Sequence, residues 1–139
     1  MNKIRVGLIG CGGFIRGTHV PILKSNPKFT ILATMDINEK AAVDMANDVG
    51  AAYWTTNHER LFSDGQIDAV IIGTRHDTHA ELAVQAAEAG KHIMCEKPMG
   101  LNRDECRAVV QAVRENHVKY TVGYNRGLAP MITKARYLL

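Results

Sequence analysis

The feature that most constrains the fold is an apolar segment, Ile4–Ile9, that runs directly into a glycine-rich loop. A short apolar segment of this kind is typical of a buried parallel strand. Gly10 allows the tight turn out of the strand, and Gly12 lets a pyrophosphate approach free backbone N–H groups at a helix N-terminus. The third position of this fingerprint is normally Gly or Ala, and here it is Ile15. The loop alone therefore leaves open both a dinucleotide site and a glycine-rich turn without a ligand.

Strand-like and helix-like segments alternate along the rest of the chain. We expect strands at residues 4–9, 29–35, 51–53, 69–72, 92–95 and 119–122. We expect helices at 14–25, 39–49, 58–63, from 79 to Gly90, from 103 onward and at 129–139, with Pro21 in a first turn or a kink. The alternation predicts an α/β fold with a doubly wound parallel sheet (the Rossmann fold), in three αβα layers with strand order 3-2-1-4-5-6.

Helix-capping signals support these boundaries. Asn38 and Asn102 are expected to cap their helices, and Gly50 to end the first of the two. The run Thr78-His79-Ala80-Glu81 has the form of a capping box.

Composition narrows the class of protein. A chain of 139 residues fits one domain, and its 46% hydrophobic and 22% charged residues are typical of a soluble globular protein. The net charge of +3 comes from scattered basic residues, so we expect no nucleic-acid partner. The longest uncharged stretch is too short to cross a membrane, and no secretory signal opens the chain. Three cysteines without a CxxC pair indicate free thiols in the cytoplasm.

The second expected strand ends in an acid that strengthens the dinucleotide hypothesis. Asp36 follows Ile15 at about the 20-residue spacing expected for the residue that binds the adenosine ribose. A carboxylate there accepts hydrogen bonds from both ribose hydroxyls and repels a 2′-phosphate, which favours NAD over NADP. Lys40 leaves room for NADP as well. The alternative is that Asp36 caps the next helix, a role for which Asn38 is better placed.

The loop after the fourth strand carries a His-x-x-His pair, His76 and His79. No cysteine or carboxylate stands at a recognised metal-binding distance from them along the chain, so we predict no metal site. We expect His79 to pack in the first helical turn and to stabilise the loop.

The loop after the fifth strand reads Glu96-Lys97-Pro98, and it would lie at the same sheet edge. Lys97 there can donate a hydrogen bond to a substrate hydroxyl or to the nicotinamide ribose, and partial burial would suit it to proton transfer. Glu96 would pair with Lys97 or orient it, and the Lys97–Pro98 bond can be cis. An ordinary polar turn is the alternative. Asn125, after the sixth strand, would line the nicotinamide end of the crevice or lie in an exposed loop.

The whole chain resembles the glucose–fructose oxidoreductase / inositol 2-dehydrogenase / rhizopine-catabolism (Gfo/Idh/MocA) family. The resemblance rests, in order, on VGLIGCGGFIRGTHVP, MDIN, IIGTRHDTHAELAVQAAEAGKHIMCEKP and VGYNRGLAP. The combination of His79, Gly90-Lys91-His92 and Glu96-Lys97-Pro98 is far more specific than a glycine loop. Family members commonly have a different residue at the position of Arg75 and a small residue at the position of Ile15.

The resemblance implies hydride transfer between NAD, or NADP, and a sugar, cyclitol or related polyol, with Lys97 as the catalytic residue. It also implies a set of cofactor-binding residues. Gly10, Gly12, Gly13, Phe14 and Ile15 would line the phosphate loop, and Thr74, Arg75, His76, His79, Glu96, Lys97 and Asn125 would border the cofactor.

The resemblance further implies a second domain that these residues do not contain. Residues 1–123 would form the dinucleotide-binding domain, and 124–139 would begin the connection to a C-terminal substrate domain. That domain supplies further catalytic groups and most contacts of a homo-oligomer. The final helix has no stop signal, so we expect a longer parent chain.

Two alternatives remain open. A non-catalytic NAD-binding or redox-sensing module does not need Lys97, so the lysine distinguishes it from the enzyme. A Rossmann domain for another nucleotide, such as S-adenosylmethionine, would also use Asp36, but the Glu-Lys-Pro loop does not suit it.

Overall fold

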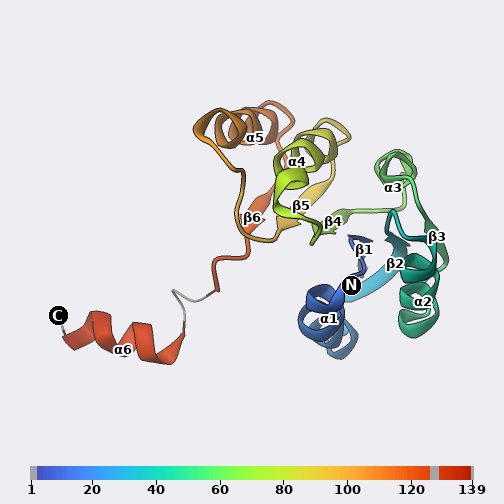
Figure 1. The fold of residues 1–139 in the computed structure, drawn as a ribbon, viewed down its shortest axis with the longest axis horizontal. Coiled ribbons are helices and arrows are strands. Elements are labelled where there is room, and N and C mark those ends of the chain that lie inside the picture. The colour runs from blue at the N-terminus through green and yellow to red at the C-terminus, as the bar shows by residue number, and fades with distance from the viewer. Residues whose placement is uncertain (1–2, 126–128, 139) are drawn as a thin grey trace.

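The computed structural model describes residues 3–125 and 129–138 and confirms the doubly wound fold (Figure 1). Its six strands are all parallel and lie in the predicted order β3-β2-β1-β4-β5-β6. The strands are β1 (Ile4–Ile9), β2 (Phe29–Met35), β3 (Tyr53–Thr55), β4 (Ala69–Ile72), β5 (His92–Cys95) and β6 (Tyr120–Val122). The order reverses between β1 and β4, where a doubly wound sheet binds its ligand.

Helices cover both faces of the sheet. A π-helical turn (Ile15–His19) leads into α1 (Val20–Ser25), and the other helices are α2 (Glu39–Val49), α3 (His58–Ser63), α4 (His79–Glu88), α5 (Arg103–Glu115) and α6 (Pro130–Leu138). α1 and α2 pack on one face, and α3, α4 and α5 on the other. α6 stands apart from the sheet (Figure 1). No helix in the described ranges has the length and apolar character needed to cross a membrane.

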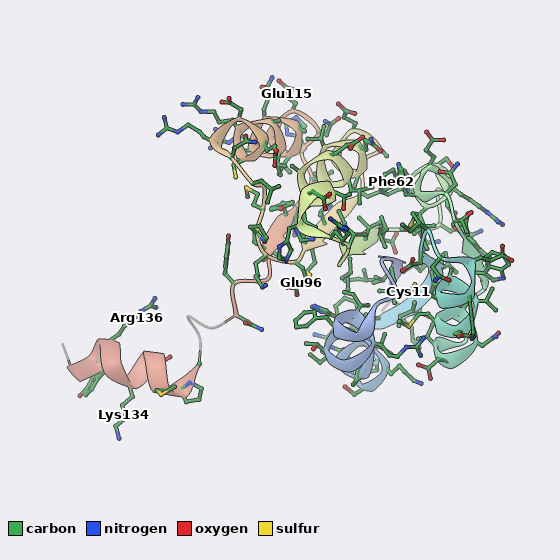
Figure 2. The ribbon with its side chains drawn as sticks, in the orientation of Figure 1. Cys11, Phe62, Glu96, Glu115, Lys134 and Arg136 are labelled. Carbon is green, nitrogen blue, oxygen red and sulfur yellow. The ribbon has the colours of Figure 1, made fainter. Side chains whose placement is uncertain are left out.

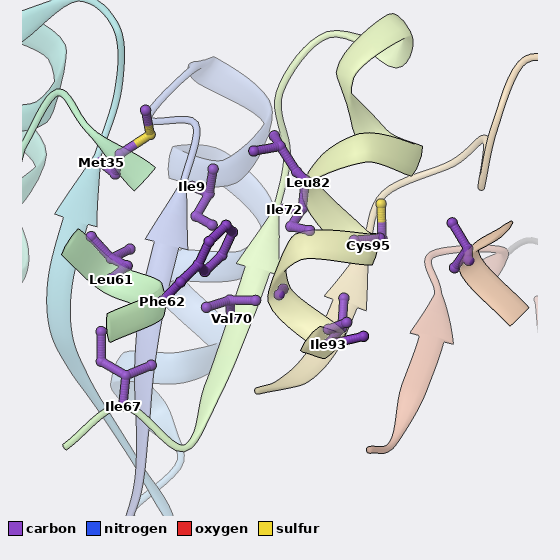
Figure 3. Packing of buried hydrophobic residues seen from close by; sticks show 14 of the residues in the cluster. Ile9, Met35, Leu61, Phe62, Ile67, Val70, Ile72, Leu82, Ile93 and Cys95 are labelled. Atoms are coloured by element: carbon purple, nitrogen blue, oxygen red, sulfur yellow. The ribbon is translucent and has the colours of Figure 1, made fainter. Parts of the chain in front are cut away.

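Two hydrophobic cores follow from the alternation of side chains along each strand. Val6 and Leu8 of β1 face α1 and α2, whereas Ile9 faces α3 and α4. Figure 3 shows Phe62 of α3 lying over Ile9 and Val70 in the second of these cores. Because both faces are covered, the inner strands are apolar on both sides, as the sequence predicts.

Most helix boundaries agree with the capping signals. Asn38 Oδ1 accepts the N–H of Ala41 at 3.2 Å, and Asn102 Oδ1 accepts the N–H of Glu105 at 2.9 Å. Gly50 ends α2 in the left-handed conformation, with φ of 66°. These contacts satisfy backbone groups that a helix end leaves unpaired.

The predicted capping box at Thr78 is wrong. Thr78 already has helical dihedrals at the end of a 3-10 turn (His76–Thr78), and its side chain makes no cap hydrogen bond. Its hydroxyl instead donates back to the Arg75 carbonyl at 2.8 Å. The sequence pattern fails because the preceding loop offers this hydroxyl an acceptor of its own.

Two strands begin later than predicted. β3 starts at Tyr53 rather than Ala51, because the N–H of Ala51 completes the end of α2 by bonding to the Ala46 carbonyl at 3.0 Å. β6 starts at Tyr120 rather than Lys119.

The helix after the glycine loop begins near Phe14, as predicted, and contains a wider turn before Pro21. The N–H of Val20 bonds to the carbonyl of Ile15, five residues back. Proline has no N–H to donate to the preceding turn, and such local widening is one way a helix accommodates it. Of the two places expected for Pro21, the structure has the first, because Pro21 lies in the first turn of α1, directly after the π turn.

A polar network closes the amino-terminal edge of the sheet, opposite the candidate site. Arg5 binds Asp68 through Nε at 3.1 Å and Nη2 at 2.9 Å, and the Arg5 N–H bonds to the same carboxylate. The buried Lys91 ammonium donates to the carbonyls of Asp64 and Ile67 at 2.7 and 3.1 Å. The side-chain hydrogen bond from Arg5 is the main cause of a lowered pKa at Asp68.

This lowered pKa predicts a pH-dependent contribution to stability. A carboxyl whose pKa is depressed on folding stabilises the native state above its unfolded value, near about 4, and loses this contribution as the pH falls through the folded pKa. We expect Asp68→Asn to lower the free energy of unfolding near neutral pH by about 1 kcal/mol or less, because the pair is partly exposed.

Chemical denaturation of both proteins across the acid range measures the effect. The difference in the free energy of unfolding between the two proteins should narrow below pH about 4. The exposed change Asp44→Asn should alter the free energy of unfolding little at any pH. A gap that stays constant down to the lowest pH would contradict this account.

Candidate functional site

One row of residues marks where the chain leaves the sheet at its carboxyl edge. The residue after each of β2, β1, β4, β5 and β6 donates its N–H to the last carbonyl of the neighbouring strand. These five donors, here called the edge row, are in spatial order Asp36, Gly10, Gly73, Glu96 and Gly123. Their bonds measure 2.8 to 3.3 Å, so the ladder continues one residue beyond the strands. The row places two carboxylates among three residues without side chains.

Gly10 has no tolerance for a side chain. Its φ is 91°, and a Cβ would lie 2.7 Å from the carbonyl oxygen of Gly73. The loops after β1 and β4 therefore touch through their backbones at the point where the strand order reverses. This close approach is what the first glycine of the fingerprint provides.

Gly12 and Gly13 are exposed at the start of the following helix, with no atom within 4 Å of a Cβ built on either. This open space suits a phosphate group bound by backbone N–H groups. Cys11 between Gly10 and Gly12 is buried (Figure 2), and its thiol donates to the Met35 carbonyl. Burial raises the pKa of Cys11 to about 12, so this thiol stays protonated and is no nucleophile.

Ile15 fits the loop because position 73 is glycine. The Ile15 side chain is fully buried, and a Cβ on Gly73 would lie 2.2 Å from its Cδ1. Ile15 thus fills the volume that a side chain at position 73 would take, and helix and sheet remain closely packed. The departure from the fingerprint is therefore accommodated by packing, and the Ile15 side chain lies in the core.

Asp36 is fixed by two backbone N–H groups. Oδ2 accepts the N–H of Cys11 at 2.7 Å, and Oδ1 accepts the N–H of Asn38 at 2.9 Å. The carboxylate therefore joins the glycine loop to the end of β2. Each oxygen keeps further acceptor capacity, so the group can still bind ribose hydroxyls. Asn38, not Asp36, caps α2, as predicted.

A cleft of about 330 Å³ opens beside Asp36. Its walls come from the glycine loop, the end of β2, α3 and the start of α4, and include Gly10, Asp36, Ile37, His58, Thr74 and Arg75. Ile37 is 88% exposed, an unusual state for an isoleucine and a ready apolar surface for a flat ring. A larger, open groove along the outer face of α5 shares none of these residues.

His79 lies beneath the site rather than in it. Its ring is fully buried, with Nδ1 2.7 Å from the Pro98 carbonyl and Nε2 3.2 Å from the Thr74 carbonyl. His79 therefore joins the loop after β4 to the loop Glu96-Lys97-Pro98 after β5, here called the lysine loop. These contacts agree with the expectation that His79 packs in the first helical turn, and Arg75 and His76 are exposed beside it.

The lysine loop agrees with only part of the expectation. Lys97 is exposed, so the partial burial that would suit it to proton transfer is not present, and the Lys97–Pro98 bond is cis. Glu96 (Figure 2) does not pair with the Lys97 side chain. Its Oε1 accepts a hydrogen bond from His19 Nε2 at 2.7 Å, and its Oε2 accepts the N–H of Lys97 at 3.3 Å.

The remaining predicted residues lie at the rim. Phe14 is 53% exposed on the glycine loop, and Asn125 is exposed just beyond β6. The sequence reasoning missed His19, Gly73, Gly123 and Ile37. Only Ile37 carried a local signal, since it directly follows Asp36, the residue predicted to bind the ribose. The others act through contacts across the sheet.

Comparison with known proteins agrees with this geometry. Residues 4–124 match the family described as an oxidoreductase family with an NAD-binding Rossmann fold. The chain is 38% identical over 138 residues to an oxidoreductase from Formosa agariphila, covering 99% of this chain and 43% of the relative. It is 35% identical over 133 residues to an inositol 2-dehydrogenase from Rhizobium meliloti, covering 96% of this chain and 39% of that protein.

A solved structure shares the fold in detail. GenD2 from gentamicin A biosynthesis, in complex with NAD, superposes with a TM-score of 0.91 at 28% identity, over 99% of this chain and 39% of that one. The chain thus spans about two fifths of the length of the proteins it matches. It belongs to the Gfo/Idh/MocA oxidoreductase family, as an NAD-binding Rossmann domain.

Proposed function

We propose that this chain is the cofactor domain of an oxidoreductase that transfers hydride between NAD and a sugar, cyclitol or related polyol. The observation that carries the proposal is the contact between Asp36 and the N–H of Cys11, which joins the ribose acid to the phosphate loop. The open space at Gly12 and Gly13 lies on one side of this contact, and the cleft beside Ile37 lies on the other. Pyrophosphate, ribose and an adenine ring would each have a matching surface.

NAD is favoured over NADP by the charges near Asp36. Its carboxylate would repel a 2′-phosphate. Two nearby cations could bind such a phosphate, Lys40 and Arg16, and both are already paired, Lys40 with Asp44 at 2.6 Å and Arg16 with Asp48 at 3.0 Å. NADP binding would therefore require one of these surface pairs to open.

Lys97 would act where the substrate hydroxyl reacts. NAD supplies a hydride acceptor at the nicotinamide carbon, and the protein must hold the substrate and move the hydroxyl proton. Lys97 projects from the lysine loop at the same edge as the glycine loop, and its exposed ammonium is free to meet a substrate covered by a further domain. A purely NAD-binding module would not need this lysine.

The domain boundary falls after β6 in this proposal. Residues 1–123 would hold the cofactor, and 124–139 would lead toward a substrate domain that supplies further catalytic groups and oligomer contacts. The separation of α6 from the sheet supports this division (Figure 1). Residues 126–128 and 139 of the connection lie outside the described ranges.

The cofactor preference gives the first test of this function. In a fluorescence titration, we expect NADH to bind at least about tenfold more tightly than NADPH, or ~1.4 kcal/mol. Asp36→Asn keeps the size of the side chain but removes its charge, so the difference between the NADH and NADPH affinities should become smaller. Asp104→Asn, an exposed change on α5, is the control. Tighter binding of NADPH by the wild-type chain would contradict the role of Asp36.

The phosphate loop gives a test that separates binding from folding. A Cβ at Gly12 meets no atom, so Gly12→Ala should change the free energy of unfolding by less than about 1 kcal/mol. The methyl group would occupy the phosphate path and weaken NADH binding by at least about tenfold. Gly17→Ala also meets no atom within 4 Å and should bind NADH normally. Equal affinity of the two variants would place the phosphate elsewhere.

Turnover tests the need for further catalytic groups. We expect the 139-residue chain to bind NADH but to oxidise inositols and sugars no faster than a Lys97→Met variant, because the rest of the substrate site is missing. Steady-state assays of cofactor reduction measure this. Substantial turnover that depends on Lys97 would show that this domain holds a complete catalytic site.

A further inference from the structure

A nearly buried hydrogen bond joins the phosphate-loop helix to the lysine loop. His19 Nε2 donates to Glu96 Oε1 at 2.7 Å, and the two side chains are only 14% and 10% exposed. His19 comes from the π turn after the glycine loop, and Glu96 directly precedes Lys97. The contact thus bridges the loop that would bind the pyrophosphate and the loop that would lie near the nicotinamide.

The backbone before Pro21 sets the direction of His19. In the π turn the N–H of Val20 reaches the carbonyl of Ile15, so His19 projects differently from its direction in a regular α-helix. Single π turns of this kind are frequent at functional sites. The ring of Phe14 on the glycine loop meets the His19 ring edge-on, with centroids 5.8 Å apart. His19 is therefore held between the phosphate loop and Glu96.

The position of the Glu96 carboxylate also depends on its neighbours. A Cβ on Gly123 would lie 2.8 Å from Glu96 Oε1, so a larger residue at this place in the edge row would push the carboxylate out of its present position. A carboxylate this deeply buried needs partners, and His19 and the N–H of Lys97 supply them. Moving His19 would leave the buried charge without its closest partner, so the Glu96 carboxylate, which also accepts the Lys97 N–H, would be free to shift.

We propose that His19 is a positioning residue that, through Glu96, sets the backbone of Lys97 according to whether the phosphate loop is filled. The proposal rests on the proposed function, since it requires a dinucleotide phosphate at Gly12 and Gly13. A phosphate there would lie next to Phe14, which packs on His19, and His19 holds Glu96. The path from phosphate to lysine therefore runs through protein contacts alone.

ADP is the probe that tests this path. ADP carries the adenosine and the diphosphate but has no nicotinamide, so it fills the phosphate loop without reaching the lysine loop. Amide NMR of the labelled chain then reports on Lys97 directly. In the wild-type chain, saturating ADP should shift the Lys97 amide resonance.

Two replacements of His19 separate positioning from packing. His19→Phe keeps a ring but cannot donate to Glu96, and it should reduce the Lys97 shift at least about twofold while ADP affinity changes by less than about threefold. His19→Gln keeps a donor and should restore most of the shift. His117→Asn changes an exposed histidine far along the chain and should leave the response intact. If His19→Phe does not fold, Glu96→Gln, which offers a weaker neutral acceptor, should also give a smaller shift.

The outcomes distinguish the two proposals. A Lys97 shift as large in His19→Phe as in the wild type would overturn the role of His19. Wild-type binding of ADP without any Lys97 shift would also overturn it and leave the proposed function standing. Failure of the wild-type chain to bind ADP would overturn the proposed function, and this inference with it.

Discussion

The continuation of the sheet hydrogen bonds into the edge row is the constraint on which the site depends. Asp36, Gly10, Gly73, Glu96 and Gly123 each donate to a neighbouring strand, so five loops leave the sheet at one level. Side chains in one row of a parallel sheet share a face. The glycines leave volume on that face, and their neighbours use it: Ile15 lies over Gly73, and the Glu96 carboxylate lies against Gly123.

The sequence was sufficient to predict the architecture because the architecture depends on local patterns. Short apolar segments alternating with capped helices define the strand order, and Asp36 is identified by its distance along the chain from the glycine loop. The predictions from sequence fail where a partner elsewhere in the fold determines the contacts of a residue. Ile15 breaks the fingerprint locally and is compensated by Gly73, far along the chain. The hydroxyl of Thr78 bonds backward into its loop, and Glu96 selects His19 rather than the adjacent Lys97.

Two histidines hold the lysine loop from opposite sides. His79 contacts the Pro98 carbonyl from below the loop, and His19 contacts Glu96 from the phosphate-loop helix. Between them Lys97 is exposed, and its N–H is bonded to Glu96. This arrangement suits a domain that supplies one wall of an active site, because the lysine is exposed at the edge where a second wall would cover it.

A crystal structure of the chain with NADH would test the central claim, that the edge row forms a dinucleotide site, most directly. The account predicts the pyrophosphate against the N–H groups near Gly12 and Gly13, and both adenosine ribose hydroxyls bonded to the Asp36 carboxylate. A dinucleotide bound in the groove along α5, or an adenosine ribose placed away from Asp36, would contradict it.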